Sequence, residues 1–428
     1  MLSTDVEGER HTSDVRKALP HEPCNEQHDI EISAPPPCKG INTEHFRGRI
    51  LTIIMAPVPE VELFVPVNAI KQKTLSKPVV AKTGSIVWKT PKASGLLDQL
   101  YPSEELTPAI GRLYPTLQLS ELLEHEAADE LIRDLAIIIS RRGVVIFKSQ
   151  DISPEQQKFL TNRLGQLTGK PSTSGLHVHP VYNAERTSNN PIDEKGTRNQ
   201  DNEISVINSD LFQSLEVFEH SDADEWHSDI AFEPVPADYT SLKVHTLPST
   251  GGDTLWSSGY ELYDRLSPAF RTLAESLEAR FHPPEFIQAA RKQDFGIYPG
   301  PRGAAENVNT HLTADHPVVR TNPVTGWKTL FGAGQHFSRF KGLSTTENRF
   351  LRDYFHQHIA QTHTAQVRHR WEKNDLAIWD NRSTYHAATP DYFSLGSRSG
   401  VRAVSCGETP YLDPASVSRK AELGSKLI

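Results

Sequence analysis

Cysteine is scarce in this chain, because only Cys24, Cys38 and Cys406 occur among 428 residues. Three cysteines so widely spaced build neither a disulfide framework nor a cysteine-rich zinc site. Their scarcity predicts a protein of a reducing compartment, and we expect the cytoplasm.

Long apolar runs are also missing. No segment approaches the roughly 18 apolar residues of a transmembrane helix, and the polar, acidic residues 1–10 are unlike a secretory signal. A basic surplus is absent too, since 45 Lys and Arg stand against 54 Asp and Glu. Because nucleic-acid binders carry a basic surface, we expect neither a membrane nor a nucleic acid as partner.

The chain divides by composition into an arm, a domain and a tail. Residues 1 to about 50 are polar and contain Pro35-Pro36-Pro37, which predicts disorder. Residues 56–114, rich in Pro, Lys and Ser, are typical of an extended arm. Met55 leaves two interpretations open, a translation start or an ordinary position after a real flexible tail. We therefore expect an N-terminal arm over 1–114, a domain over 115–414 and a C-terminal tail over 415–428.

Periodicity within the domain predicts helices followed by many short strands. Residues 121–141 have helical spacing of apolar residues, and Ser153 and Pro154 are a helix cap and first helical residue. Further helices are predicted over 260–279, 285–292 and 345–361. Strand-like pieces are found at 144–147, 177–182, 205–208, 239–247, 254–257, 329–332, 366–370, 376–379 and 402–406. The pattern indicates a mainly β fold with flanking helices (α+β) around a double-stranded β-helix, or jelly-roll, core.

Two His-x-acid triplets occur, at His220 and at His227. Roughly two are expected by chance, so the triplet alone indicates little. The first lies in the acidic stretch 219–225, whereas the second lies among aromatic and aliphatic residues. Alternation along an extended chain would place His227 and Asp229 on the same side. A second histidine and these two could hold Fe(II) on one face; His386 is a candidate, although its position alone is typical of a surface or core histidine.

Seven segments occur in an order and spacing that is similar to one known family. They are 143–147, 176–182, 226–229, 247–256, 316–321, 377–382 and 402–411. Together the segments resemble the taurine dioxygenase (TauD/TfdA) family of iron(II)- and 2-oxoglutarate-dependent oxygenases, over residues 115 to 414. The N-terminal arm falls outside the resemblance and looks like the extension of fungal members.

The resemblance implies a set of site residues and co-substrates. The iron ligands would be His227, Asp229 and His386, and 2-oxoglutarate would be held by Thr254 and Arg398. The positions that face the sulfonate in taurine-cleaving members are His179, Tyr182 and Arg402, with Phe232 and Phe331 as an apolar wall. Fe(II), 2-oxoglutarate and O2 would be required, and ascorbate would support turnover.

Other interpretations of the same residues stay open. Gly251-Gly252 also suits a hairpin turn, and the pair Arg398 and Arg402, on one strand face, also suits solvated surface arginines. His177-Val178-His179 with Glu185 resembles a cupin metal motif at slightly different spacing. The stretch 223–225 lacks the amide side chain that contacts taurine in the family, so the amine end of a substrate would be read differently.

The expected activity is hydroxylation of a small anionic substrate. We expect an alkyl sulfonate such as taurine, with release of sulfite and an aldehyde; a sulfate ester or a carboxylate is also compatible. An alternative within the family is a specialised-metabolism hydroxylase or oxidative cyclase acting on an amino acid or alkaloid. A further alternative is a non-catalytic binding protein. Residues 283–315 are a candidate lid, and the oligomeric state, including a homo-oligomer, is left open.

Overall fold

The computed structural model describes residues 90–181, 201–208, 225–292, 296–392 and 394–424 of the 428-residue chain. These residues lie within one unit that runs from Thr83 to Ile428. The predicted disorder of residues 1–50, the alternative start at Met55, and Tyr182 fall outside the described residues. None of the described helices is long and apolar enough to cross a membrane.

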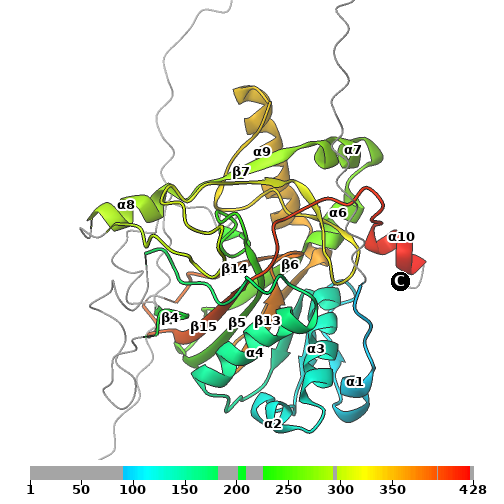
Figure 1. Cartoon of the computed structure of the whole chain (residues 1–428), viewed down its shortest axis with the longest axis vertical. Coiled ribbons are helices and arrows are strands. Elements are labelled where there is room, and N and C mark those ends of the chain that lie inside the picture. The colour runs from blue at the N-terminus through cyan, green and yellow to red at the C-terminus, as the bar shows by residue number, and fades with distance from the viewer. Residues whose placement is uncertain (1–89, 182–200, 209–224, 293–295, 393, 425–428) are drawn as a thin grey trace, which may run out of the picture. The chain divides into compact units, whose positions relative to one another are not determined.

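Seven strands form the main sheet, in the order β1-β2-β3-β13-β5-β15-β4 (Figure 1). They are β1 (Glu104–Glu105), β2 (Arg112–Tyr114), β3 (Val144–Phe147), β4 (Ile204–Asn208), β5 (Ala237–Thr246), β13 (Leu376–Asp380) and β15 (Ser399–Cys406). Only β2 and β3 pair in parallel; the other neighbours are antiparallel.

The main sheet is buried on both faces. In β3, Val145 and Phe147 pack on the helix side, whereas Val144 and Ile146 pack on the opposite side. Successive side chains of a strand point to alternate faces, so a strand covered on both sides is apolar throughout. This explains the continuous apolar run and confirms the strand predicted at 144–147.

Four helices cover the first face: α1 (Leu96–Leu100), α2 (Leu119–Glu124), α3 (Ala128–Arg142) and α4 (Pro154–Leu167). In Figure 1, α3 and α4 lie across the main sheet. The cap predicted at Ser153 is confirmed, because Ser153 and Gln156 form a reciprocal capping box. The single helix predicted over 121–141 is instead α2 and α3. Between them Nδ1 of His125 accepts the N–H of Ala127 at 3.0 Å, a local bond that competes with helix continuation.

A smaller sheet covers the other face of the main sheet. It has the order β12-β6-β14 and consists of β6 (Thr254–Ser258), β12 (Gln366–His369) and β14 (Thr384–Ala388). The rings of Trp256 in β6 and Trp379 in β13 lie 5.9 Å apart in the core between the two sheets. The main sheet is therefore enclosed by helices on one side and by a second sheet on the other, which confirms a mixed fold with flanking helices.

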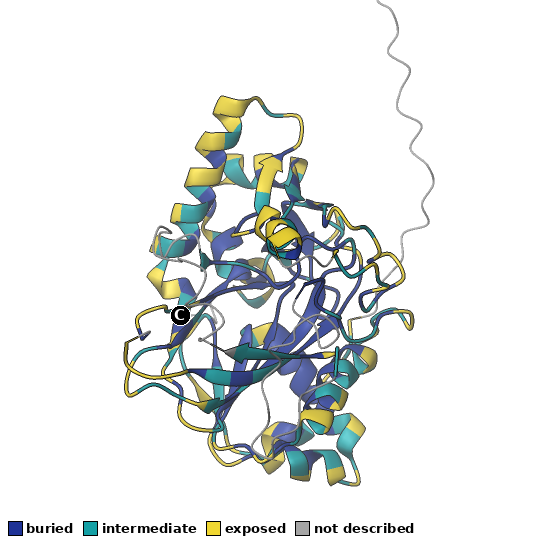
Figure 2. Ribbon diagram, turned by 90° about the vertical axis from the view of Figure 1, so that its left-hand side faces the viewer, coloured by how far each residue is buried: buried dark blue, intermediate teal, exposed yellow. Residues whose placement is uncertain are grey.

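The remaining elements surround a third core. They are α6 (Gly259–Arg265), α7 (Pro268–Ser276), β7 (Glu278–Phe281), α8 (Pro284–Lys292), β8 (Ala314–Pro317), β9 (Val319–Thr321), β10 (Lys328–Leu330), β11 (Phe337–Phe340), α9 (Thr345–Gln361), η3 (His363–Ala365) and α10 (Arg419–Leu423). Strands β11, β7 and β8 form one sheet, and β9 pairs with β10. Figure 2 shows the sheets mainly buried and the helices with exposed outer faces.

The described chain is folded before residue 115. Leu97 of α1 is buried, and the ring of Tyr114 in β2 stacks on Phe147 at 5.7 Å. Residues 96–114 thus belong to the folded part, although the sequence suggested an arm. The predicted helix over 260–279 is α6, α7 and the start of β7, because Ser267 caps a new helix. The strand predicted at 177–182 is not formed over residues 177–181, the part that the structure describes. The nearest strand-like pairing is an isolated bridge between Leu176 and Ser405.

Candidate metal centre

The backbone joins His227 and His386 directly. His386 lies in β14, where it pairs with Trp256 of β6. On its other side its main chain exchanges both hydrogen bonds with His227, at 2.8 and 2.9 Å. Residues directly opposite in an antiparallel pair place their side chains on the same face. The two imidazole centroids consequently lie 4.1 Å apart.

Asp229 faces the same side as His227. Ser228 between them points the other way, and its hydroxyl donates to the carbonyl of Asn381 at 2.8 Å. This is the alternation that the sequence predicts, although it holds for a very short stretch because a turn begins at Asp229.

A chain of hydrogen bonds from Asn381 holds the carboxylate of Asp229. The amide N–H of Asn381 donates to the hydroxyl of Thr240 at 2.8 Å, and that hydroxyl donates to Oδ2 of Asp229 at 2.8 Å. The amide oxygen of Asn381 accepts the backbone N–H of Asp229 and the indole N–H of Trp379, both at 3.1 Å. Outer contacts of this kind orient the groups that bind a metal.

Burial and neighbouring charges set the protonation of the three residues. Burial lowers the pKa of His386 to about 3 and lowers the pKa of His227 below its usual value. Burial alone would raise the pKa of Asp229, but the charge of Arg402, ahead of those of the two histidines, outweighs it and lowers the pKa. At neutral pH the group therefore consists of two neutral imidazoles and one carboxylate, the states that bind metals.

These three residues form a geometry suited to one metal ion. One ligand atom from each of His227, Asp229 and His386 lies within 4.8 Å of the others, the only such group found among the described residues. Nδ1 of His227 donates to the carbonyl of Glu225 at 2.7 Å, which leaves Nε2 for a metal. Two imidazoles and one carboxylate fit Fe(II) and leave its other coordination positions for small ligands.

Thr254 and Arg398 meet near this group. Thr254 pairs with Ala388, two residues after His386 in the same strand. A guanidinium nitrogen of Arg398 lies 3.4 Å from the hydroxyl of Thr254, and that hydroxyl also accepts from the indole N–H of Trp371 at 3.0 Å. Arg398 is buried, and its charged end lies 5.8 Å from the centre of the Trp371 ring. A forked guanidinium beside a hydroxyl suits a carboxylate ligand.

Gly252 permits the approach of Arg398. Its carbonyl accepts from Nε of Arg398 at 2.8 Å, and a Cβ on Gly252 would lie 2.8 Å from Cδ of that arginine. Gly251 and Gly252 both have positive φ, at 80° and 71°. They do not close a hairpin, because β5 and β6 belong to different sheets.

Arg402, in β15, reaches the metal side of the site. Its Nη1 donates to Oδ1 of Asp229 at 2.9 Å, while its Nε is buried and has no hydrogen-bond partner in the part of the chain that the structure describes. Arg398 just precedes β15 and contacts Thr254 instead. The two arginines therefore contact different partners, and their binding roles stay predictions.

Aromatic rings pack together beside this group. Phe286 of α8 lies 5.0 Å from His179 and 5.5 Å from Phe232, between centroids. His336 lies 5.4 Å from Phe286 and 6.2 Å from His227. The sequence predicted His179 and Phe232 here. It missed Phe286 and His336, which lie outside the seven segments that resemble the family.

Comparison with known proteins agrees with this geometry. The family model described as "Taurine catabolism dioxygenase TauD, TfdA family" matches residues 102–404. This chain belongs to the TauD/TfdA family. As a member it is a 2-oxoglutarate-dependent dioxygenase, and the family implies iron and O2 as well.

Relatives of this TauD/TfdA chain include fungal dioxygenases. It is 42% identical over 354 residues to an alpha-ketoglutarate-dependent dioxygenase of Penicillium shearii, covering 75% of this chain and 93% of the relative. It is 29% identical to an alpha-ketoglutarate-dependent sulfonate dioxygenase of Saccharomyces cerevisiae, covering 75% and 73%. The solved structure of AAD-2 in complex with Mn(II) and N-oxalylglycine shares the fold, with a TM-score of 0.52 and 21% identity over 73% of this chain and 99% of that one.

Phe331 and His177 have buried partners of their own. Phe331 packs against Phe281 at 6.0 Å and lies 4.8 Å from the guanidinium carbon of Arg320, in the same core cluster as Phe232. His177, part of the cupin-like alternative, lies 3.2 Å from Glu233, which Arg302 holds at 2.5 Å. His177 is thus engaged in a buried ionic cluster, while Glu185 lies outside the described residues.

The lid predicted over 283–315 is anchored at one end. Asn307 is buried and its side chain exchanges hydrogen bonds with the backbone of Val235, both at 2.9 Å. Helix α8 at the other end is less buried and carries Phe286 over the site. A lid movement stays a prediction, and α8 is the part placed to make it.

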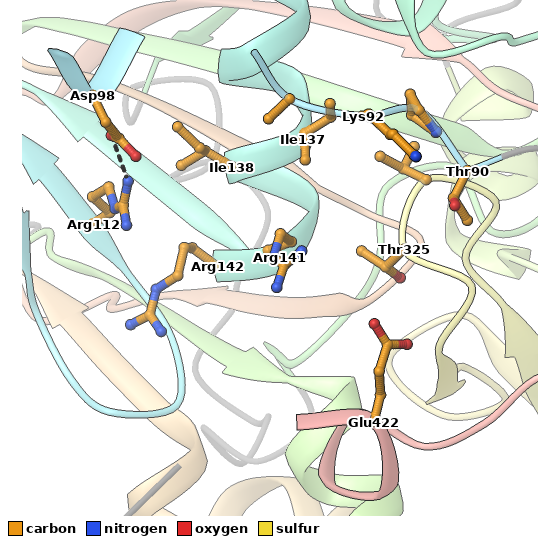
Figure 3. A pocket seen from close by; sticks show the side chains of 13 residues that line it. Thr90, Lys92, Asp98, Arg112, Ile137, Ile138, Arg141, Arg142, Thr325 and Glu422 are labelled. Carbon is orange, nitrogen blue, oxygen red and sulfur yellow. Dashed lines mark hydrogen bonds and ion pairs between the residues drawn. The ribbon is translucent and has the colours of Figure 1, made fainter. Parts of the chain in front are cut away.

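A separate cavity lies away from this centre. It measures about 570 Å³ and is bounded by the chain around Lys92, the end of α3 at Arg141, and Glu422 of α10 (Figure 3). None of its lining residues belongs to the metal group or to the Arg398 and Thr254 pair.

Proposed function

We propose that this TauD/TfdA enzyme binds Fe(II) through His227, Asp229 and His386 and hydroxylates a small anionic substrate, an alkyl sulfonate such as taurine. The observation that carries the proposal is the contact of the Arg402 guanidinium with Asp229, which places a cation at the edge of the metal group. We also propose that the main sheet and the β12-β6-β14 sheet are the walls of a double-stranded β-helix, and that the enzyme works in the cytoplasm.

Each group has a physical task in this proposal. Bound iron would activate O2 for oxidation of 2-oxoglutarate and of a substrate C–H bond. Arg398 and Thr254 bind the distal carboxylate of 2-oxoglutarate, and Trp371 fixes the threonine hydroxyl. Asn381 and Thr240 keep the Asp229 carboxylate oriented. The surrounding rings exclude water from the reacting carbon.

The substrate side favours an anion with an apolar body. Arg402 supplies the charge, and only part of its guanidinium is engaged by Asp229. Phe232 and Phe286 supply the apolar surface. If the hydroxylated carbon bears a sulfonate, the product collapses to an aldehyde and sulfite.

A second candidate keeps the chemistry and changes the substrate. A specialised-metabolism hydroxylase or oxidative cyclase would act on an amino acid or alkaloid. This second candidate is supported by sequence identity, which is 42% to the Penicillium shearii dioxygenase and 29% to the yeast sulfonate dioxygenase.

The test is aerobic turnover with Fe(II), ascorbate and 2-oxoglutarate, in which succinate and sulfite are measured with and without alkyl sulfonates. Succinate stimulated by a sulfonate, with matching sulfite, supports the proposal. Slow succinate without sulfite moves the assignment to the second candidate. No succinate at all from folded protein would favour a non-catalytic binding protein.

A further inference from the structure

His336 connects the metal group with helix α8. Its ring centroid lies 6.2 Å from that of His227 and 5.4 Å from that of Phe232. On the α8 side, its Nδ1 lies 3.0 Å from Oε1 of Glu285. The side chain of His336 is 8% exposed and that of Glu285 is 48% exposed. The pair therefore links a buried ring beside His227 to a half-exposed carboxylate on α8.

The loop before His336 is fixed against the metal-binding segment. The N–H of Gln335 donates to the carbonyl of Trp226, the residue before His227, at 2.9 Å. Gly334 has a φ of +109°, and a Cβ there would lie 2.8 Å from the same carbonyl oxygen. The backbone of His336 accepts from the N–H of His282 at 2.8 Å. His336 is thus held in place from both sides.

Glu285 retains capacity for a further ligand. Burial raises the pKa of this carboxyl, but the contact with His336 and the charge of that ring outweigh it, so the pKa is lowered and the group is ionised at neutral pH. A carboxylate offers about four acceptor positions, and His336 approaches Oε1. The next residue, Phe286, belongs to the aromatic wall of the site. An ionised carboxylate therefore borders the space where a substrate would lie.

We propose that Glu285, oriented by His336, binds an ammonium group of the substrate, so that the preferred substrate is a zwitterion. Its anionic group would meet Arg402, its apolar chain would lie against Phe232 and Phe286, and its amine would meet Glu285. The charge of Glu285 disfavours substrates with a second anionic group at that end. This inference rests on the proposed function and narrows its substrate class.

Glu285 also occupies a position where a carboxylate stabilises a helix. It follows Pro284 in the first turn of α8, near the positive end of the helix dipole. Glu155 follows Pro154 in α4 in the same way and is exposed. Glu155→Gln is therefore a matched control that removes the same charge from an equivalent helix position away from the site.

The experiment compares probes that differ only by an amine. Binding of 3-aminopropanesulfonate against propanesulfonate, and of 4-aminobutyrate against butyrate, is measured by calorimetry on the anaerobic protein with Fe(II) and 2-oxoglutarate. Substrate-stimulated succinate is measured with the same probes in air. We expect wild type and Glu155→Gln to prefer the amine in at least one pair by about tenfold or more, the size of one charge-assisted contact. We expect Glu285→Gln to lose that preference with an unchanged KM for 2-oxoglutarate.

A second variant separates orientation from packing. His336→Phe keeps a ring beside Phe232 and Phe286 but removes the contact with Glu285. We expect it to weaken the amine preference by several-fold while affinity for the amine-free probe stays within about twofold. A loss of affinity for both members of a pair would mean that His336 only packs, and would overturn its orienting role.

The outcomes are separable from those of the proposed function. Equal binding with and without the amine, or an amine preference that survives in Glu285→Gln, overturns the inference while leaving the dioxygenase assignment untouched. A preference seen only among the carboxylates supports the inference and overturns the sulfonate assignment. If none of the four probes binds, the inference fails, and succinate formed without any substrate reports independently on the iron chemistry.

Discussion

The proposed metal ligands and the proposed substrate contacts are held by different kinds of structure. His227 and His386 are paired through their main chains, and Asn381 fixes Asp229 through both ends of its amide. The proposed substrate contacts instead come from separate elements: Arg402 lies in β15, Phe286 in α8, and His336 in a loop that is hydrogen-bonded to the carbonyl of Trp226 through its neighbour Gln335.

The fold therefore sets the separation of the two histidines, whereas individual side chains would set which substrate is recognised. Main-chain pairing holds two ligands at a fixed separation whatever their neighbours are, which suits a metal that demands defined geometry. Ring contacts between a helix and a loop can be altered by single substitutions, which suits recognition of varied substrates. The following substitutions test that contrast.

The largest effect is expected from loss of a metal-group imidazole. His227→Ala should abolish substrate-stimulated succinate, because two residues are too few to hold iron in one geometry. The main-chain pairing with His386 does not need the side chain, so we expect thermal unfolding within a few degrees, roughly, of wild type. Succinate production at the wild-type rate would contradict the ligand assignment.

Asn381→Ala should weaken metal binding without abolishing it. The residue touches no metal position, but it orients Asp229, and loss of such outer contacts lowers metal affinity by about 10–100-fold. Calorimetric titration of Mn(II) measures the change. Thr240→Val should also lower the affinity for Mn(II). Thr240→Ser should bind Mn(II) as wild type does, since serine keeps the hydroxyl that donates to Asp229. Full affinity in Thr240→Val would show that the hydrogen-bonded chain is unimportant.

Substitution of each arginine should weaken the binding of a different anionic ligand. Arg398→Ala should raise the KM for 2-oxoglutarate, whereas Arg402→Ala should raise the substrate KM far more than the 2-oxoglutarate KM. About tenfold or more is expected in each case for loss of a charge-assisted contact. Steady-state kinetics with both reactants varied distinguishes the two. The reverse pattern would mean that their roles are exchanged.

The smallest effect is expected from the aromatic wall. Phe286→Ala should raise the substrate KM by several-fold, because it removes an apolar surface that Phe232 still partly supplies. Metal affinity and the 2-oxoglutarate KM should not change, since the ring of Phe286 packs on His179, Phe232 and His336. A changed Mn(II) affinity would show that the proposed metal ligands and the proposed substrate contacts are coupled. Leu273→Ala, at a partly exposed position of α7, is the control for a general loss of packing.

Sequence patterns predicted the strand at 144–147 and the helix cap at Ser153 because both depend on local residue order. The run at 144–147 and the cap at Ser153 are both set by neighbouring residues. The break between α2 and α3 was missed because one imidazole contact, at His125, decides it. The folded residues before 115 were missed because β1 and β2 are very short, and their partners β3 and α3 lie farther along the chain.

The sequence pointed to those candidate site residues that resemblance to the family could identify. Family resemblance selected His227, Asp229 and His386, which spacing alone could not distinguish from chance. Asn381 stood inside a quoted motif, but its task depends on Thr240, which is brought near only by folding. His336 and Phe286 lie outside the seven segments that resemble the family, so their proximity to His227 could not be predicted from spacing.

The Ser228–Asn381 hydrogen bond joins residues 153 positions apart in the chain. During synthesis, at about 5–20 residues per second, the ribosome must therefore add the whole intervening stretch after Asp229 before β14 exists. Until then the proposed ligand group lacks His386. If the three residues bind iron as proposed, a truncated product ending before His386 would lack one of the three ligands and should not assemble the redox centre.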